Sequence, residues 1–75
     1  MDYADELRRD VEMHLYYANA YLESRHWEMV QTNIDLGIQC LLPIENYLTR
    51  REFDFYLNAY NTVQANLNNS RPVRR

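Results

Sequence analysis

Two pairs of acidic and histidine side chains are spaced so that they could do chemistry on a helix. Asp10 and His14 are four residues apart, and Glu23 and His26 are three residues apart. A carboxylate one turn from an imidazole can hydrogen-bond it, as in an acid–base pair. Glu-x-x-His is also the inward-facing motif of di-metal helical bundles, but those sites need a second motif and further glutamates. We therefore interpret Asp10 and His14 as a surface pair and expect no metal site.

Cys40 and the glycine content also argue against catalysis. No basic residue is close to Cys40 in the sequence, whereas a nucleophilic thiolate needs a positive neighbour and an oriented base. A single cysteine excludes an internal disulfide. A single glycine, Gly37, excludes a glycine-rich phosphate-binding loop. We expect neither an enzyme nor a bound cofactor, and we interpret Cys40 as a small apolar residue.

Arginine supplies every basic side chain, and five arginines lie at the two ends of the last predicted helix. They are Arg50, Arg51, Arg71, Arg74 and Arg75. Such groups could contact the phosphates of nucleic acid. The eight arginines are outnumbered by eleven acids, and the net charge is −3. A nucleic-acid-binding face needs a basic surface, so this role is the alternative hypothesis and a solvated tail is the simpler interpretation.

Three helices are predicted to position these residues. Asp2 is a candidate N-cap for a first helix over residues 2–24. A second helix begins at Ser24 or His26 and is expected to stop at Leu42, because Pro43 restricts the residue before it. Residues 44–48 form a short turn or continue this helix beyond a kink. Apolar residues recur on one face of both helices: Ala4, Leu7, Val11, Leu15, Ala18 and Leu22, then Trp27, Val30, Ile34, Ile38 and Leu41.

The third helix has the clearest start signal. Thr49 and Glu52 fit the capping box, in which each side chain accepts a hydrogen bond from the other residue's backbone. Pro72 prevents continuation beyond Ser70. Large apolar residues follow the cap at steps of three and four: Phe53, Tyr56, Tyr60, Val63 and Leu67. The predicted fold is all-α, a small three-helix bundle made of a helical hairpin and a capped third helix, with one domain over residues 1–70 and a flexible arginine-rich tail over 71–75.

The first two predicted helices carry a second apolar stripe that faces away from this core. Its residues are Met13, Tyr16, Tyr17, Ala20, Met29 and Leu36. A surface helix of a monomeric bundle needs only one apolar stripe. The surplus therefore predicts a contact surface for a protein partner or for a second copy in a homodimer. Gly37 lies in the middle of the second helix, at a cost of about 1 kcal/mol, which predicts close approach by a neighbouring helix or ring.

Two short segments resemble known families. Residues 9–14 begin with Arg9 and end with His14, which is similar to the R-x4-H string of HEPN-type ribonucleases. That resemblance implies contact of both side chains with RNA at a dimer interface. Residues 47–67, one capped helix rich in tyrosine and alanine, resemble the last helices of the Hha-type modulators of bacterial nucleoid proteins. Both matches are short, and we assign the chain to no family on them.

Length and composition complete the functional prediction. Seventy-five residues allow one domain. No apolar run approaches the roughly 20 residues that span a bilayer, and the acidic start is unlike a signal peptide. We therefore expect a cytoplasmic location and no membrane partner. The predicted function is a non-enzymatic protein-binding module, a small regulator, adaptor or inhibitor acting as a homodimer. The alternatives are a nucleic-acid-associated regulator and a HEPN-like ribonuclease.

Overall fold

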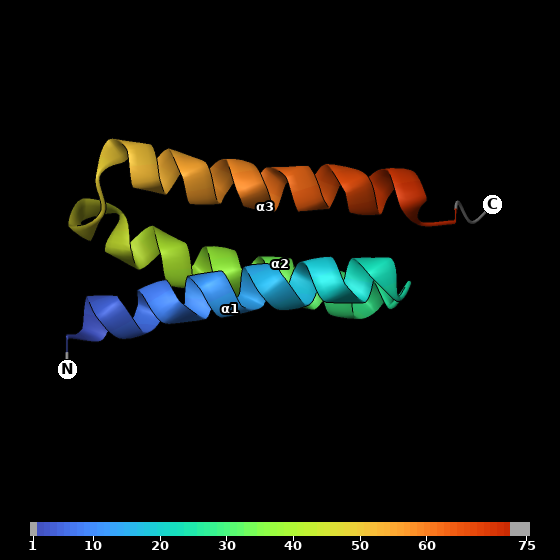
Figure 1. Ribbon diagram of the computed structural model, residues 1–75, viewed down its shortest axis with the longest axis horizontal. Coiled ribbons are helices and arrows are strands. Elements are labelled where there is room, and N and C mark those ends of the chain that lie inside the picture. The colour runs from blue at the N-terminus through green and yellow to red at the C-terminus, as the bar shows by residue number, and fades with distance from the viewer. Residues whose placement is uncertain (1, 73–75) are drawn as a thin grey trace.

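The chain folds into three long helices, as the sequence predicts. The computed structural model describes residues 2–72 and contains α1 (Tyr3–Glu23), α2 (Trp27–Leu41), the 3-10 segment η1 (Leu42–Tyr47) and α3 (Arg50–Ser70). Successive α-helices run in opposite directions along the long axis (Figure 1). There is no β-strand within residues 2–72. None of the helices in this range has the length and the apolar character needed to cross a membrane.

The first connection is a tight turn without glycine or proline. Asp2 caps α1 as predicted, and its carboxylate accepts a hydrogen bond from the Ala4 amide at 3.2 Å. At the other end Arg25 has a φ of 62°, in the left-handed region that favours glycine. The His26 amide donates to the Tyr21 carbonyl at 3.0 Å, which closes the turn. His26 then precedes the first residue of α2, so the second of the two predicted start sites is the one used.

Pro43 ends α2 but does not end helical winding. The α-helix stops at Leu41, and the chain continues through the six residues of η1 in tighter 3-10 turns. Pro43 is tolerated because it lies in the first turn of η1, where the amide hydrogen that proline lacks would have no partner within the helix. Leu48 is extended and leads into α3. The structure thus lies between the two alternatives for residues 44–48, since a 3-10 turn is present but spans Leu42–Tyr47 and continues directly from α2.

The capping box at Thr49 is confirmed. The Thr49 hydroxyl accepts from the Glu52 amide at 3.1 Å, and a Glu52 carboxylate oxygen accepts from the Thr49 amide at 3.0 Å. The other Glu52 oxygen accepts from the Arg8 guanidinium at 2.6 Å. The hydrogen bonds from Thr49, with the help of Arg8, lower the pKa of the Glu52 carboxyl. One carboxylate thus starts α3 and attaches its first turn to α1.

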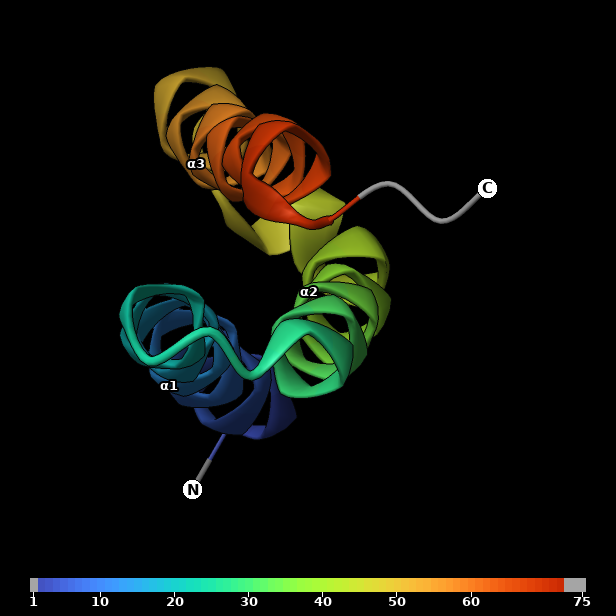
Figure 2. The same cartoon turned by 90° about the vertical axis from the view of Figure 1, so that its right-hand side faces the viewer.

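The helix α2 contacts both of the other α-helices. Figure 2, which looks along the helices, shows α2 at the corner of a triangle, with α1 below it and α3 above it. The α1–α2 contact is the most extensive, the α2–α3 contact is smaller, and α1 meets α3 least. The molecule is elongated, with principal extents of 45 × 22 × 18 Å. The hairpin of α1 and α2 is therefore the main packing unit, and α3 lies along it.

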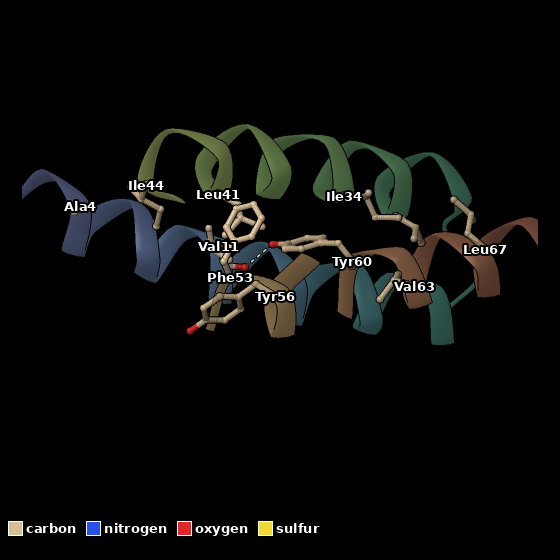
Figure 3. Close-up of a cluster of buried hydrophobic side chains, with 12 residues drawn as sticks. Ala4, Val11, Ile34, Leu41, Ile44, Phe53, Tyr56, Tyr60, Val63 and Leu67 are labelled. Atoms are coloured by element: carbon tan, nitrogen blue, oxygen red, sulfur yellow. Dashed lines mark hydrogen bonds between the residues drawn. The ribbon is translucent and has the colours of Figure 1, made fainter. Parts of the chain in front are cut away.

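The core lies where the three predicted apolar faces meet (Figure 3). The apolar row of α3 is buried along its whole length, as predicted, and so are Val11 and Ile44. Leu7, Leu15 and Leu22 of α1 are only partly buried, because α1 makes little contact with α3. Twelve apolar residues make up the core: Ala4, Val11, Ala18, Val30, Ile34, Leu41, Ile44, Phe53, Tyr56, Tyr60, Val63 and Leu67.

Gly37 gives the ring of Tyr60 a place to cross α2, which confirms the predicted close approach. A methyl group added at Gly37 would overlap the Tyr60 hydroxyl and ring. Tyr60 is fully buried, and its hydroxyl donates to the Val11 carbonyl of α1 (Figure 3). Burial also raises the pKa of the Tyr60 phenol well above its usual value. This one side chain therefore links all three α-helices.

A pair of glutamines joins α2 to α3 at the edge of the core. The side-chain amide of Gln31 donates to the Gln64 oxygen, and the Gln64 amide donates back to Gln31, both at 2.9 Å. Each amide also reaches a residue one turn further along its own helix, Asp35 on α2 and Asn68 on α3. These bonds satisfy the polar groups that the packing of α3 on α2 partly buries.

Candidate functional site

The candidate site is centred on a polar contact between α1 and α2. A ring nitrogen of His14, Nδ1, lies 2.9 Å from the side-chain oxygen of Asn33. Asn33 is buried, and its amide nitrogen donates to the Met29 carbonyl at 2.8 Å. His14 therefore faces α2, in contrast to the surface pair with Asp10 that the spacing suggests. Sequence analysis missed this contact because a pattern along one helix gives no sign of a partner 19 residues away.

Four apolar side chains surround this contact on the surface of the hairpin. Met13 precedes His14 and Tyr17 follows it by one turn, while Met29 and Leu36 are one turn before and after Asn33. Their exposed fractions are 41, 44, 41 and 40 %. We call these four residues the hairpin face. All four are thus exposed large apolar side chains, each with less than half of its surface in solvent.

The hairpin face points away from α3. Val11 of α1 and Gln31 of α2 mark the sides of the hairpin that contact α3. At about 100° per residue, the four side chains of the hairpin face lie roughly 120–160° around their helices from these two positions. The predicted second stripe is thus a surface separate from the core.

The two other residues of the predicted contact stripe are exposed as well. Tyr16 is 71 % exposed, and its ring meets the ring of Tyr17 edge-on with centroids 5.7 Å apart. Ala20 is also exposed, one turn beyond Tyr16. Both residues extend the apolar surface of α1 to the side away from α2. Tyr47 and Phe55 are exposed aromatic residues too, but they belong to η1 and α3.

The arginines proposed as nucleic-acid contacts have different surroundings. Arg50 forms ion pairs with Glu45 at 3.8 Å and with Asp54 at 3.5 Å. Arg51 has no ion-pair partner within residues 2–72. Arg71 is exposed and lines a hollow with Trp27, Glu28 and Pro72. Arg74 and Arg75 lie outside the described residues, as does most of the predicted tail.

A second hollow lies beside Arg51, and it was not predicted from the sequence. It has a volume of about 310 Å³ and is lined by Arg8 of α1 with Arg51, Glu52, Phe55 and Tyr56 of α3. Phe55 is 66 % exposed and packs edge-on against Tyr56 with centroids 5.6 Å apart. The signal in the sequence is that Phe55 lies outside the apolar row of α3 and four residues after Arg51. A cation and an exposed ring one turn apart can contact an anionic, partly apolar group.

The side chains considered for catalysis have ordinary structural contacts. Nδ1 of His26 lies 2.7 Å from the Ser24 hydroxyl at the turn between α1 and α2. Within residues 2–72, no three histidine, cysteine or acidic side chains are grouped to bind a metal. Cys40 is partly buried, and its pKa is raised by burial and by the charge of Asp10. A raised pKa keeps the thiol protonated, which is the reverse of what nucleophilic catalysis needs.

Comparison with known proteins gives no significant match to this chain. No protein-family model matches this sequence, and neither the curated proteins nor the solved structures include a significant match to it.

Proposed function

We propose that the chain is a small non-enzymatic protein-binding module, a regulator, adaptor or inhibitor that acts by occupying the surface of a partner. The partner is a second copy or a different protein. One observation supports the proposal above all: Met13, Tyr17, Met29 and Leu36 form an exposed apolar surface on two packed helices, on the side away from α3. Contiguous apolar surfaces of this kind on small proteins mark interaction sites.

The residue types of the hairpin face suit protein binding. Methionine is flexible and polarisable, so it adapts to different partner shapes. Tyrosine supplies a large contact area with a polar tip that remains at the wet edge of an interface. The His14–Asn33 contact and the core beneath give these side chains a rigid support. A rigid support lowers the entropy that is lost on binding.

The test compares two variants in which an exposed tyrosine becomes glutamate. Tyr17→Glu places a charge in the hairpin face, and Tyr47→Glu places the same charge at a tyrosine of η1 that is 72 % exposed. Each protein is first sized by light scattering against the chain mass of 9.1 kDa and then used as bait, with captured proteins identified by mass spectrometry. We expect Tyr17→Glu to remove the dimer or the captured partner, and Tyr47→Glu to keep it. Equal behaviour of both variants would contradict the proposal.

Of the arginines that the nucleic-acid alternative would use, Arg51 lines a hollow together with the exposed ring of Phe55. A base stacked on Phe55 with a phosphate near Arg51 is the arrangement that single-strand-binding proteins use. Glu52 lines the same hollow, and Asp5 lines the next hollow along α1, so acidic groups stand close by. The net charge of −3 also repels phosphate at long range. Protein binding is therefore the function that we favour.

A further inference from the structure

We infer that the hairpin face binds a cationic amphipathic helix of another protein. This inference rests on the proposed function and names the chemical class of the partner. It follows from two properties of the hairpin, the spacing of its exposed apolar side chains and the distribution of charge around them. The occupant it disfavours is a second copy of this chain.

The spacing of the four side chains suits one helix laid along the hairpin. Met29 and Leu36 are seven residues apart, which is two turns or about 10 Å along α2. Met13 and Tyr17 are about one turn apart on α1, which runs beside α2 in the opposite direction. The four side chains thus form two short rows on either side of the α1–α2 contact. A partner helix with apolar residues at successive turns can place them between such rows.

The charge of the hairpin favours a basic partner. Residues 1–41 contain eight acids and three arginines, a net charge of −5, whereas residues 42–75 contain three acids and five arginines, a net charge of +2. The helix α2 has no basic residue at all. Of the three hairpin arginines, Arg8 is already paired with Glu52. The field around the hairpin therefore attracts lysine and arginine side chains that flank an apolar stripe.

One carboxylate lies at the end of the hairpin face itself. Asp10 is seven residues before Tyr17, so it lies two turns away on the same side of α1. Asp10 is partly buried, and its charge helps to raise the pKa of the Cys40 thiol, so its field reaches α2. A basic residue beyond the apolar stripe of a partner helix would meet Asp10 when the stripe lies between the two rows.

The same charges disfavour a homodimer through this surface. A two-fold dimer brings identical surfaces together, so two hairpins with a net charge of −5 each would face one another. Like charges brought close across an interface oppose association. A cationic helix supplies equivalent apolar contacts with attraction in place of this repulsion.

The test uses two synthetic helical peptides of about five turns with the same leucine stripe. In one peptide all the remaining positions are lysine, and in the other they are all glutamate. Isothermal titration with the full chain at physiological salt should show binding of the leucine–lysine peptide and none of the leucine–glutamate peptide. Leu36→Gln should weaken that binding by about tenfold or more, as loss of a central apolar contact does. Phe55→Gln, which changes an exposed ring on α3, should leave it unchanged.

Several results would overturn the inference, and they differ from failure of the proposed function. If Leu36→Gln and Phe55→Gln weaken binding equally, the peptide is attracted by net charge alone. One such result is a dimer, seen by light scattering, that Leu36→Gln abolishes. Another is binding of the leucine–glutamate peptide that Leu36→Gln weakens. In either case the hairpin face binds proteins, but the proposed class of partner is wrong. If neither peptide binds and the Tyr17→Glu bait captures the same proteins as wild type, the proposed function fails as well. Circular dichroism shows whether Leu36→Gln is folded, and Met29→Gln provides a second variant of the same surface.

Discussion

At the scale of single residues, the contact between Gly37 and Tyr60 determines how closely the helices approach. Glycine in the middle of a helix costs about 1 kcal/mol relative to alanine. Here that cost allows a fully buried ring to lie across α2 and to donate a hydrogen bond to the Val11 carbonyl of α1. A buried hydrogen bond contributes about 1 kcal/mol, and burial of the ring contributes roughly 1.5–3 kcal/mol more. The gain from Tyr60 therefore exceeds the cost of Gly37.

We expect Gly37→Ala to destabilise the chain by about 1–3 kcal/mol, the usual cost of overpacking a core. Helix propensity alone predicts the opposite sign, because alanine is the better helix former. Chemical denaturation measures the free energy of unfolding, and Thr32→Ala, at an exposed position of the same helix, is the matched control. The control should be neutral or slightly stabilising. A Gly37→Ala variant as stable as the control would mean that the Tyr60 ring does not cross α2 at this point.

At the scale of the elements, the start of α3 depends on a single carboxylate with two tasks. Glu52 accepts from the Thr49 amide with one oxygen and from Arg8 of α1 with the other. Glu52 thus marks the end of the connection between η1 and α3, and it also holds the first turn of α3 against α1. Since α1 and α3 touch little elsewhere, this pair and the Tyr60 hydrogen bond are the principal polar links between them within residues 2–72.

We expect Thr49→Ala to lower the free energy of unfolding by about 1 kcal/mol, the usual contribution of an N-cap. The midpoint of chemical denaturation should fall while the slope stays the same. Thr62→Ala, at an exposed position in the middle of α3, is the control for loss of a threonine hydroxyl. If the midpoint does not move, the cap does not contribute to stability and α3 is held by its apolar row alone.

The sequence was sufficient for the elements and insufficient for several contacts between them. The cap at Thr49 and the apolar row of α3 are local patterns, and both are present as predicted. The left-handed Arg25 was not predictable, because nothing local distinguishes it from a residue that extends a helix. The His14–Asn33 contact was missed because it depends on the alignment of α1 with α2, which hydrophobic spacing leaves open. The exposure of the hairpin face was predicted because surplus apolar spacing is visible along each helix separately.

At the scale of the whole molecule, the buried core of the described chain ends at Leu67. Leu67 is fully buried and is the last core residue, whereas Asn68, Asn69 and Ser70 are exposed. Arg71 contributes a backbone hydrogen bond to the Leu67 carbonyl, and its side chain is exposed. The domain boundary predicted at residue 70 therefore falls just after the end of the core, within an exposed segment.

We expect a chain that ends at Ser70 to melt within a degree or two of the full chain, because Arg71 and Pro72, the described residues that it loses, are exposed. A chain that ends at Asn66 lacks Leu67 and should be destabilised by about 2–5 kcal/mol, as for other deletions of a buried leucine. In a domain of this size, each kcal/mol lowers the melting temperature by about 4–8 °C. Thermal denaturation followed by circular dichroism separates the two cases. A large loss in the chain that ends at Ser70 would show that residues 71–75 dock on the helices.

The glutamine pair between α2 and α3 helps to fix the register in which α3 packs on α2. The apolar row of α3 repeats every seven residues, so sliding α3 by two turns would bring Phe53 to the place of Tyr60 and Tyr60 to that of Leu67. The slipped arrangement would keep apolar side chains at both places, although phenylalanine has no hydroxyl to donate to the Val11 carbonyl. The slip would separate Gln31 from Gln64 and leave two half-buried amides without each other. The pair thus adds to the Tyr60 hydrogen bond and the Arg8–Glu52 ion pair in acting against a competing register, and agreement among these contacts favours a single native arrangement.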